Sequence, residues 1–179
     1  GNAEREAKTL EFMRSYLKFQ KAMVNEDYEE AEKYRDQAEK RAKDATFPNI
    51  VNSLGDLKRE KYLCKGRIHL SKAEFSKATW NFTRWLSKNE EIKSTKDYQN
   101  YRILRDCCEA VTKENYSEDY LHKIEENIRF VRKKKLRPQL GEMSRLAHAY
   151  VTLKIHNIGA RARGEENLEE IRLLIAAKV

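Results

Sequence analysis

A chain of 179 residues can bury the core of one domain and is too short to hold two comfortably. Charged residues make up 37% of it, its formal net charge is +8, and no apolar run approaches the roughly 20 residues of a membrane span, which excludes an integral membrane protein. Only two prolines and six glycines are present, so the composition favours long helices over sheets.

The first feature along the chain is an acidic turn at 26–31, which follows an amphipathic stretch at 3–24. The turn has a polar or acidic residue, then a bulky apolar residue, then the start of a charged helix. The same pattern returns at 73–78, 114–119 and 166–171. Asp27 and Asn115 are good N-cap residues, and acidic side chains suit the positive end of a helix, so each turn is expected to begin a helix.

Each of these turns follows another amphipathic stretch, so the sequence predicts about eight helices in a single all-α domain covering residues 1–179. Pro48 and Pro138 fall between predicted pairs, where a residue without an amide donor ends one helix or begins the next. The helices are expected to form four antiparallel hairpins, at roughly 3–45, 54–90, 96–136 and 138–178.

Small and aromatic residues recur at similar places in these hairpins. Gly66, Cys107 and Gly159 each lie nine residues before a turn residue, and over 59–86 the order of residues is Tyr62, Gly66, Phe75, Ala78 and Phe82. In this respect the chain resembles tetratricopeptide repeats (TPRs). The resemblance implies a right-handed superhelix whose inner groove holds a peptide or helix of a partner, and it implies no catalysis. A generic helical bundle is the alternative, because it would show the same periodicity.

Nearly all of the net positive charge lies after residue 50, where three groups of basic residues are found. The groups are Lys58, Arg59, Lys61, Lys65 and Arg67 in the third predicted helix, Arg129, Arg132, Lys133, Lys134, Lys135 and Arg137 at the end of the sixth, and Arg161 and Arg163 at the end of the seventh. Such groups bind acidic ligands or the phosphates of nucleic acid, and Trp80, Trp85, Tyr98 or Tyr101 could then stack on bases. They could equally be solvated helix faces, and 133–135 could be a nuclear import signal.

No catalytic pattern is visible in the chain. A Gly-rich phosphate loop, a nucleophile elbow and closely spaced metal ligands are all missing, so we expect no enzyme, no metal and no cofactor. Three cysteines, Cys64, Cys107 and Cys108, are expected to be free and mostly buried in a reducing compartment. The enzyme alternative would use Cys107 or Cys108 as a nucleophile beside His69 or His148.

The two ends of the chain favour a piece of a longer intracellular protein, of the cytoplasm or nucleus. The chain starts with Gly1 and has no signal peptide. Its last segment begins with Ile171 and ends with Val179, and it is apolar on nearly every side. We expect more chain, a partner or a second copy of the protein to cover this segment.

These observations predict a non-catalytic adaptor that binds a peptide or protein partner in a partly basic groove. The expected apolar contacts are Tyr62, Phe75, Trp80, Phe82 and Trp85. The alternative is an RNA-binding helical scaffold that uses the basic groups at 58–67 and 129–137.

Overall fold

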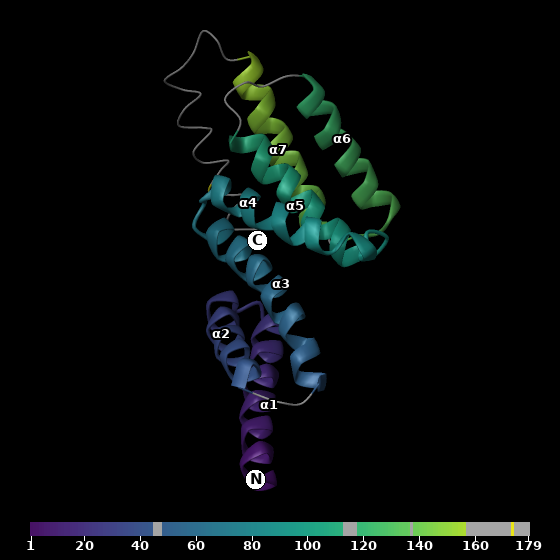
Figure 1. Ribbon diagram of the computed structural model, residues 1–179. Helices are drawn as coiled ribbons and strands as arrows, with labels where there is room; N and C mark the ends of the chain where they lie inside the picture. The colour runs from purple at the N-terminus through teal and green to yellow at the C-terminus, as the bar shows by residue number, and fades with distance from the viewer. Residues whose placement is uncertain (45–47, 113–117, 137, 157–172, 174–179) are drawn as a thin grey trace. The chain divides into compact units, whose positions relative to one another are not determined.

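A computed structural model describes residues 1–44, 48–112, 118–136, 138–156 and 173 (Figure 1). Over these ranges the chain forms seven α-helices and one short 3-10 helix, and it contains no strand. The predicted all-α class is confirmed. The eighth predicted helix falls almost entirely outside the described residues, and the TPR-like superhelix stays a prediction. No helix in the described ranges is both long and apolar enough to cross a membrane.

The chain divides into two compact units, residues 1–68 and 69–179, which we call unit 1 and unit 2. Unit 1 holds α1 (Asn2–Val24), α2 (Tyr28–Asp44) and most of α3 (Pro48–Ser71). Unit 2 holds the end of α3 and the remaining elements: α4 (Phe75–Lys88), η1 (Glu90–Ile92), α5 (Lys96–Thr112), α6 (Glu118–Lys133) and α7 (Pro138–His156). The single domain expected from the chain length stays a prediction.

The core of unit 1 forms where α1 and α2 pack along each other as an antiparallel pair. Phe12 and Phe19 of α1 lie against a stripe of alanines on α2, at positions 31, 38 and 42. Because alanine is small, the two helix backbones can approach closely. Arg41 joins the same pair by donating to the backbone carbonyl of Glu11 at 3.0 Å.

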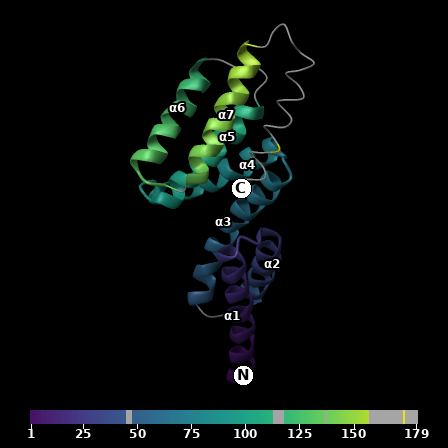
Figure 2. The ribbon, with the colours of Figure 1, turned by 180° about the vertical axis from the view of Figure 1, so that it is seen from behind.

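The core of unit 2 surrounds α5, whose buried residues cover most of its circumference. The most extensive helix contacts are α4 with α5, α6 with α7, and α5 with α7, whereas α5 touches α6 over a shorter stretch (Figure 2). These contacts cross the boundaries of the predicted hairpins at 54–90, 96–136 and 138–178. The pairing differs from the prediction because the apolar α5 can bury its faces against several neighbours at once.

Three helices end in the same way, with a residue in the left-handed conformation. Glu26, Ala73 and Lys135 have φ angles of 58°, 57° and 50°. After α1, Glu26 N–H donates to the carbonyl of Met23 at 3.1 Å and Asp27 N–H to that of Ala22 at 3.0 Å, the hydrogen bonds of a Schellman motif. Equivalent pairs of bonds follow α3 and α6.

Two of the four repeated turns in the sequence coincide with these helix ends. At the first turn, Asp27 Oδ1 accepts a hydrogen bond of 3.2 Å from Glu30 N–H, so Asp27 caps α2 as its residue type predicts. Ala73 occupies the second turn and precedes α4. The turns at 114–119 and 166–171 fall largely or wholly outside the described residues.

Candidate interaction surfaces

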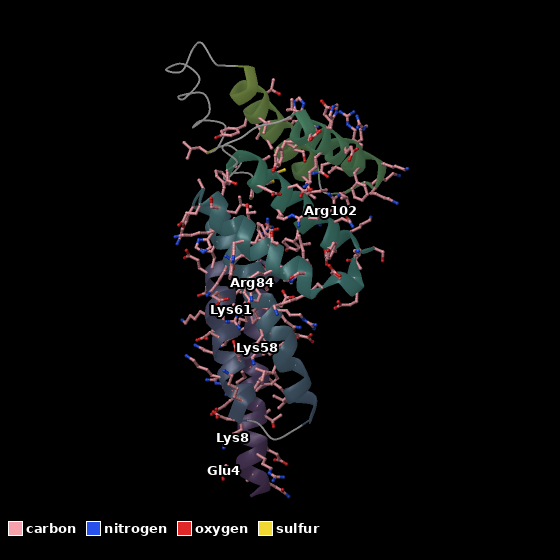
Figure 3. All side chains as sticks on the ribbon, turned by 45° about the horizontal axis from the view of Figure 1, so that its top comes forward. Glu4, Lys8, Lys58, Lys61, Arg84 and Arg102 are labelled. Carbon is pink, nitrogen blue, oxygen red and sulfur yellow. The ribbon has the colours of Figure 1, made fainter. Side chains whose placement is uncertain are left out.

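The basic group on α3 is only partly available to a ligand. Lys58 is exposed, Arg59 forms an ion pair with Asp56, and Lys61 and Lys65 are half-buried (Figure 3). Arg67 is buried: its Nη2 donates to Tyr28 Oη at 2.9 Å, and its guanidinium lies 4.8 Å from the centroid of the Tyr28 ring. Arg67 therefore holds α3 against the start of α2, and it does not form part of an open basic surface.

Acidic residues of α2 lie near two lysines of the α3 group. A hydrogen bond from Lys40 is the main cause that holds the pKa of Asp36 below its usual value, and the charge of Lys61 adds to it. Burial opposes ionisation of Glu39, but the hydrogen bond from Arg35 and the nearby positive charges, including Lys58, outweigh it and lower its pKa. Lys58 and Lys61 therefore have carboxylates of α2 within electrostatic range.

A buried arginine lies at the centre of this electrostatic arrangement. Arg35 is 1% exposed, and its guanidinium donates to both carboxylate oxygens of Glu32 at 2.9 Å, to Glu39 at 2.7 Å and to the carbonyl of Leu57 at 3.2 Å. The last bond joins α2 to α3. These acceptors satisfy the buried guanidinium within unit 1, so Arg35 is not available to bind a ligand.

The basic group at the end of α6 has a different environment. Arg129, Arg132, Lys133, Lys134 and Lys135 are all exposed. The Schellman motif turns the chain at Lys135, and Leu136 then returns to the core. Among the described residues, the cations at positions 132–135 form no ion pair with a carboxylate. This end of α6 is therefore a concentrated and accessible positive surface. Arg137, Arg161 and Arg163 lie outside the described residues.

Three of the five expected apolar contact residues lie in the core. Phe75, Phe82 and Trp85 are buried and Tyr62 is half-buried, so the expectation that Phe75, Phe82 and Trp85 contact a partner is wrong. Trp80 is the exception, since it is 56% exposed. Its ring lies under the guanidinium of Arg84, 4.8 Å from the ring centroid.

The aromatic residues expected to stack on bases are mostly packed on one another. The ring centroids of Trp85 and Tyr101 are 5.0 Å apart, those of Trp85 and Tyr98 are 6.1 Å apart, and those of Phe82 and Tyr101 are 5.9 Å apart. Trp85 and Tyr98 are buried. Of the four aromatic residues expected to stack, Trp80 alone presents an exposed ring.

A second buried charge joins α5 to α6. Asp106 is buried and accepts hydrogen bonds of 3.1 Å from Arg102 Nη1 and from Asn127 Nδ2. Arg105 and Lys123 also lie within ion-pair distance, at 3.1 and 3.4 Å. One carboxylate thus gathers three cations. These three cations contribute to the net positive charge of the chain, but their ion pairs with Asp106 place them at the contact between α5 and α6.

The cysteines show no sign of nucleophilic activation. All three are free and buried, as expected. Burial raises the pKa of Cys64 to about 12 and that of Cys107 to about 12. The Sγ of Cys107 lies 3.7 Å from Ser144 Oγ. His69 and His148 instead contact carboxylates, Glu74 at 3.3 Å and Glu125 at 3.1 Å.

We expect the native thiols to resist thiol–disulfide exchange. Because the thiolate is the reactive form, burial and the raised pKa of Cys64 and Cys107 should slow their reaction with a bulky disulfide reagent at pH 8 by roughly a hundredfold or more relative to the unfolded chain. A time course of thiol release, with and without denaturant, measures this ratio. One thiol reacting at the rate of a free cysteine in native protein would support the enzyme alternative instead.

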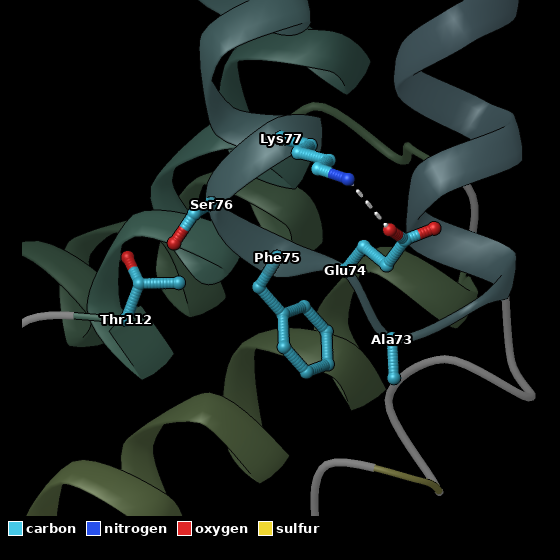
Figure 4. A pocket seen from close by; sticks show the side chains of 6 residues that line it. All are labelled: Ala73, Glu74, Phe75, Ser76, Lys77 and Thr112. Atoms are coloured by element: carbon cyan, nitrogen blue, oxygen red, sulfur yellow. Dashed lines mark hydrogen bonds and ion pairs between the residues drawn. The ribbon is translucent and has the colours of Figure 1, made fainter.

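The described residues contain no cluster of three metal-ligating side chains. They do contain a hollow of about 380 Å³ at the start of α4, lined by Ala73, Glu74, Phe75, Ser76 and Lys77 with Thr112 of α5 (Figure 4). Glu74 occupies the helix N-terminus itself. Hydrogen bonds first from Lys77 and then from His69 hold its pKa below the usual value. A negative charge of the protein thus already sits where an anion would bind.

A further exposed apolar surface, not among the expected contact residues, lies on α1. Leu10, Met13, Leu17 and Val24 are 55%, 50%, 60% and 82% exposed. They recur at intervals of three, four and seven residues, so they share one face of the helix. The spacing of residues in the sequence could have revealed this surface. Phe12, Ser15, Phe19 and Ala22 share the face of α1 that packs in the core, so the four exposed apolar residues fall on a different face.

No family model matches the chain, and no curated protein or solved structure is similar to it at a significant level.

Proposed function

We propose that the chain is a non-catalytic helical scaffold that binds an acidic segment of a partner protein, with the exposed cations at the end of α6 as the contact. The observation that supports this is the contrast between the two described basic groups. The group on α3 is partly buried and lies near carboxylates of α2, whereas the cations at positions 132–135 are all exposed and have no ion pair among the described residues. Unmatched positive charge attracts an acidic ligand and sets the rate at which it associates.

An acidic protein segment fits this surface better than single-stranded RNA does. Binding of single strands commonly combines a basic groove with aromatic rings on which bases stack. In unit 2, Trp85 and Tyr98 are buried, and the ring of Tyr101 packs against Trp85. Electrostatic contact with carboxylates requires no such rings.

The test compares two variants that lose the same charge from different places. One is Arg132→Gln/Lys133→Gln/Lys134→Gln, and the other, Lys33→Gln/Lys40→Gln/Lys43→Gln, removes three exposed lysines of α2. Fluorescence anisotropy with a short labelled peptide rich in Asp and Glu should show an affinity about tenfold lower for the first variant and nearly unchanged for the second, because charge contacts are local at physiological salt.

A labelled single-stranded RNA, titrated at about 50 and about 200 mM salt, is the competing probe. Tighter binding to RNA than to the peptide, with a steep loss at the higher salt, would replace the proposal with the RNA-binding alternative. Equal losses in the two variants would show that only net charge matters. Failure of the unmodified protein to bind either probe at low salt would identify the cations as a solvated helix end.

A further inference from the structure

Helix α1 has two apolar faces, and the structure covers one of them. The first packs against α2. The second, which we call the α1 stripe, consists of Leu10, Met13, Leu17 and Val24, each at least half exposed. A soluble helix that packs on one side usually has a polar opposite face, so a stripe of this length on the exposed face indicates a contact surface.

The charges along α1 are unevenly distributed. Its three carboxylates, Glu4, Glu6 and Glu11, all lie in the first half, but Arg5 and Lys8 lie there too and offset most of their charge. The second half, from Met13 to Val24, has Arg14, Lys18 and Lys21 and no acidic residue. Two parallel copies of such a helix would bring their basic halves together, whereas antiparallel copies keep these halves apart.

We propose that a second copy of this chain packs on the α1 stripe, with the two α1 helices antiparallel and their two-fold axis near Met13. In this arrangement Leu10 lies opposite the partner subunit's Leu17. Glu6, which is exposed beside the stripe, lies opposite the partner subunit's Lys21. A two-fold axis repeats each of these contacts, so one stripe supplies both halves of the interface.

The start of α1 supports the same partner. Residues 1–8 are all exposed, and in Figure 1 the first turns of α1 extend past the end of α2. Helical turns without tertiary contacts are marginally stable in water. In the antiparallel pair, the second half of the partner's α1 covers one side of these turns and brings the partner subunit's Lys21 to the carboxylate of Glu6.

The first test is the mass of the intact chain in solution as a function of concentration, by sedimentation equilibrium. The unmodified protein should be a dimer at high concentration. The variant Leu10→Gln/Leu17→Gln should raise the dimer dissociation constant at least about tenfold, which corresponds to 1.4 kcal/mol. Trp80→Gln, which removes an exposed apolar side chain of unit 2, is the matched control and should leave the constant unchanged.

The second test concerns direction. Glu6→Lys and Lys21→Glu should each weaken the dimer by severalfold. Combining them should restore its affinity, because opposite charges then face each other again across the interface. Amides of residues 5–8, the first that are hydrogen-bonded within α1, should also gain protection from hydrogen exchange only at concentrations where the dimer forms.

A monomer at every concentration, or a dimer indifferent to Leu10→Gln/Leu17→Gln, overturns the proposal. So does a double charge variant that stays as weak as the single ones, since the helices would then not be antiparallel. Circular dichroism of each variant confirms that the helices remain folded. The proposal is independent of ligand binding at the end of α6, because the two surfaces belong to different units.

Discussion

Replacing Arg35 with methionine is expected to lower the free energy of unfolding of unit 1 by about 3–5 kcal/mol. Methionine fills much of the same volume, but it leaves two carboxylates without their partner. The side chains of Glu32 and Glu39 are only 22% and 15% exposed, so water cannot replace the guanidinium effectively. The carbonyl of Leu57 also loses its donor.

Urea unfolding followed by far-UV circular dichroism measures this change. Tryptophan fluorescence reports on unit 2 alone, because both tryptophans of the chain, Trp80 and Trp85, lie on α4. Adding Glu32→Gln and Glu39→Gln to the methionine variant should recover part of the loss, since it removes the unpaired charges. A loss below about 1 kcal/mol would mean that Arg35 is more solvated than its burial indicates.

The same ion pairs predict how the loss depends on pH. The pKa of Glu39 is lower in the folded chain than its usual value, because its bond to Arg35 and nearby positive charges outweigh burial. Its stabilising contribution is therefore fully present above the unfolded pKa, about 4.3, and is lost as pH falls through the lower folded pKa. In the methionine variant this acid dependence should be weaker.

Replacing Phe82 with alanine is expected to destabilise unit 2 by about 3–5 kcal/mol. Phe82 has no exposed surface, and it packs with Tyr101 at the centre of the unit. Truncation leaves a cavity that the rigid surroundings fill only partly. Trp80→Ala, on the same helix, is the control. It should cost no more than about 1 kcal/mol, because it removes an exposed side chain whose ring contacts Arg84.

Both variants keep Trp85, so its fluorescence during urea unfolding measures both changes with one probe. Similar losses for the two variants would contradict the assignment of Phe82 to the core and Trp80 to the surface. A large loss for Trp80→Ala alone would indicate that Trp80 supports the fold.

The contrast between Phe82 and Trp80 shows what periodicity alone could have decided. Phe75, Ala78, Phe82 and Trp85 recur at intervals of three and four residues and form the buried face of α4, whereas Trp80 falls between them. The helical class, the capping by Asp27 and the helix start at Pro138 could likewise be predicted from local sequence, whereas α3 begins at Pro48 and not near residue 54 as expected. The expectation that Phe75, Phe82 and Trp85 contact a partner did not take this spacing into account.

The pairing of helices and charges could not be predicted in the same way. An apolar stripe on α5 fits any neighbour, so the sequence did not decide between α6 and the pair α4 and α7. Arg35 and Arg67 look like surface residues by composition. Their burial depends on acceptors brought by tertiary structure, which are Leu57 O on α3 for Arg35 and Tyr28 Oη on α2 for Arg67. Among the described basic groups, the one at the end of α6 is the most accessible, because the cations at positions 132–135 are all exposed and form no ion pair with a described carboxylate.

The Schellman motifs at the ends of α1, α3 and α6 make this protein less thermostable than it would be with glycine at their left-handed positions. Glycine adopts the left-handed conformation without steric cost, whereas residues with a Cβ lose about 1 kcal/mol or more there. The chain places glutamate, alanine and lysine at these three positions, and glycine could replace the exposed Glu26 and Lys135 without touching a core, whereas Ala73 packs against the core of unit 2. Its heat tolerance is therefore limited in part by three backbone torsions, separately from how well its cores are packed.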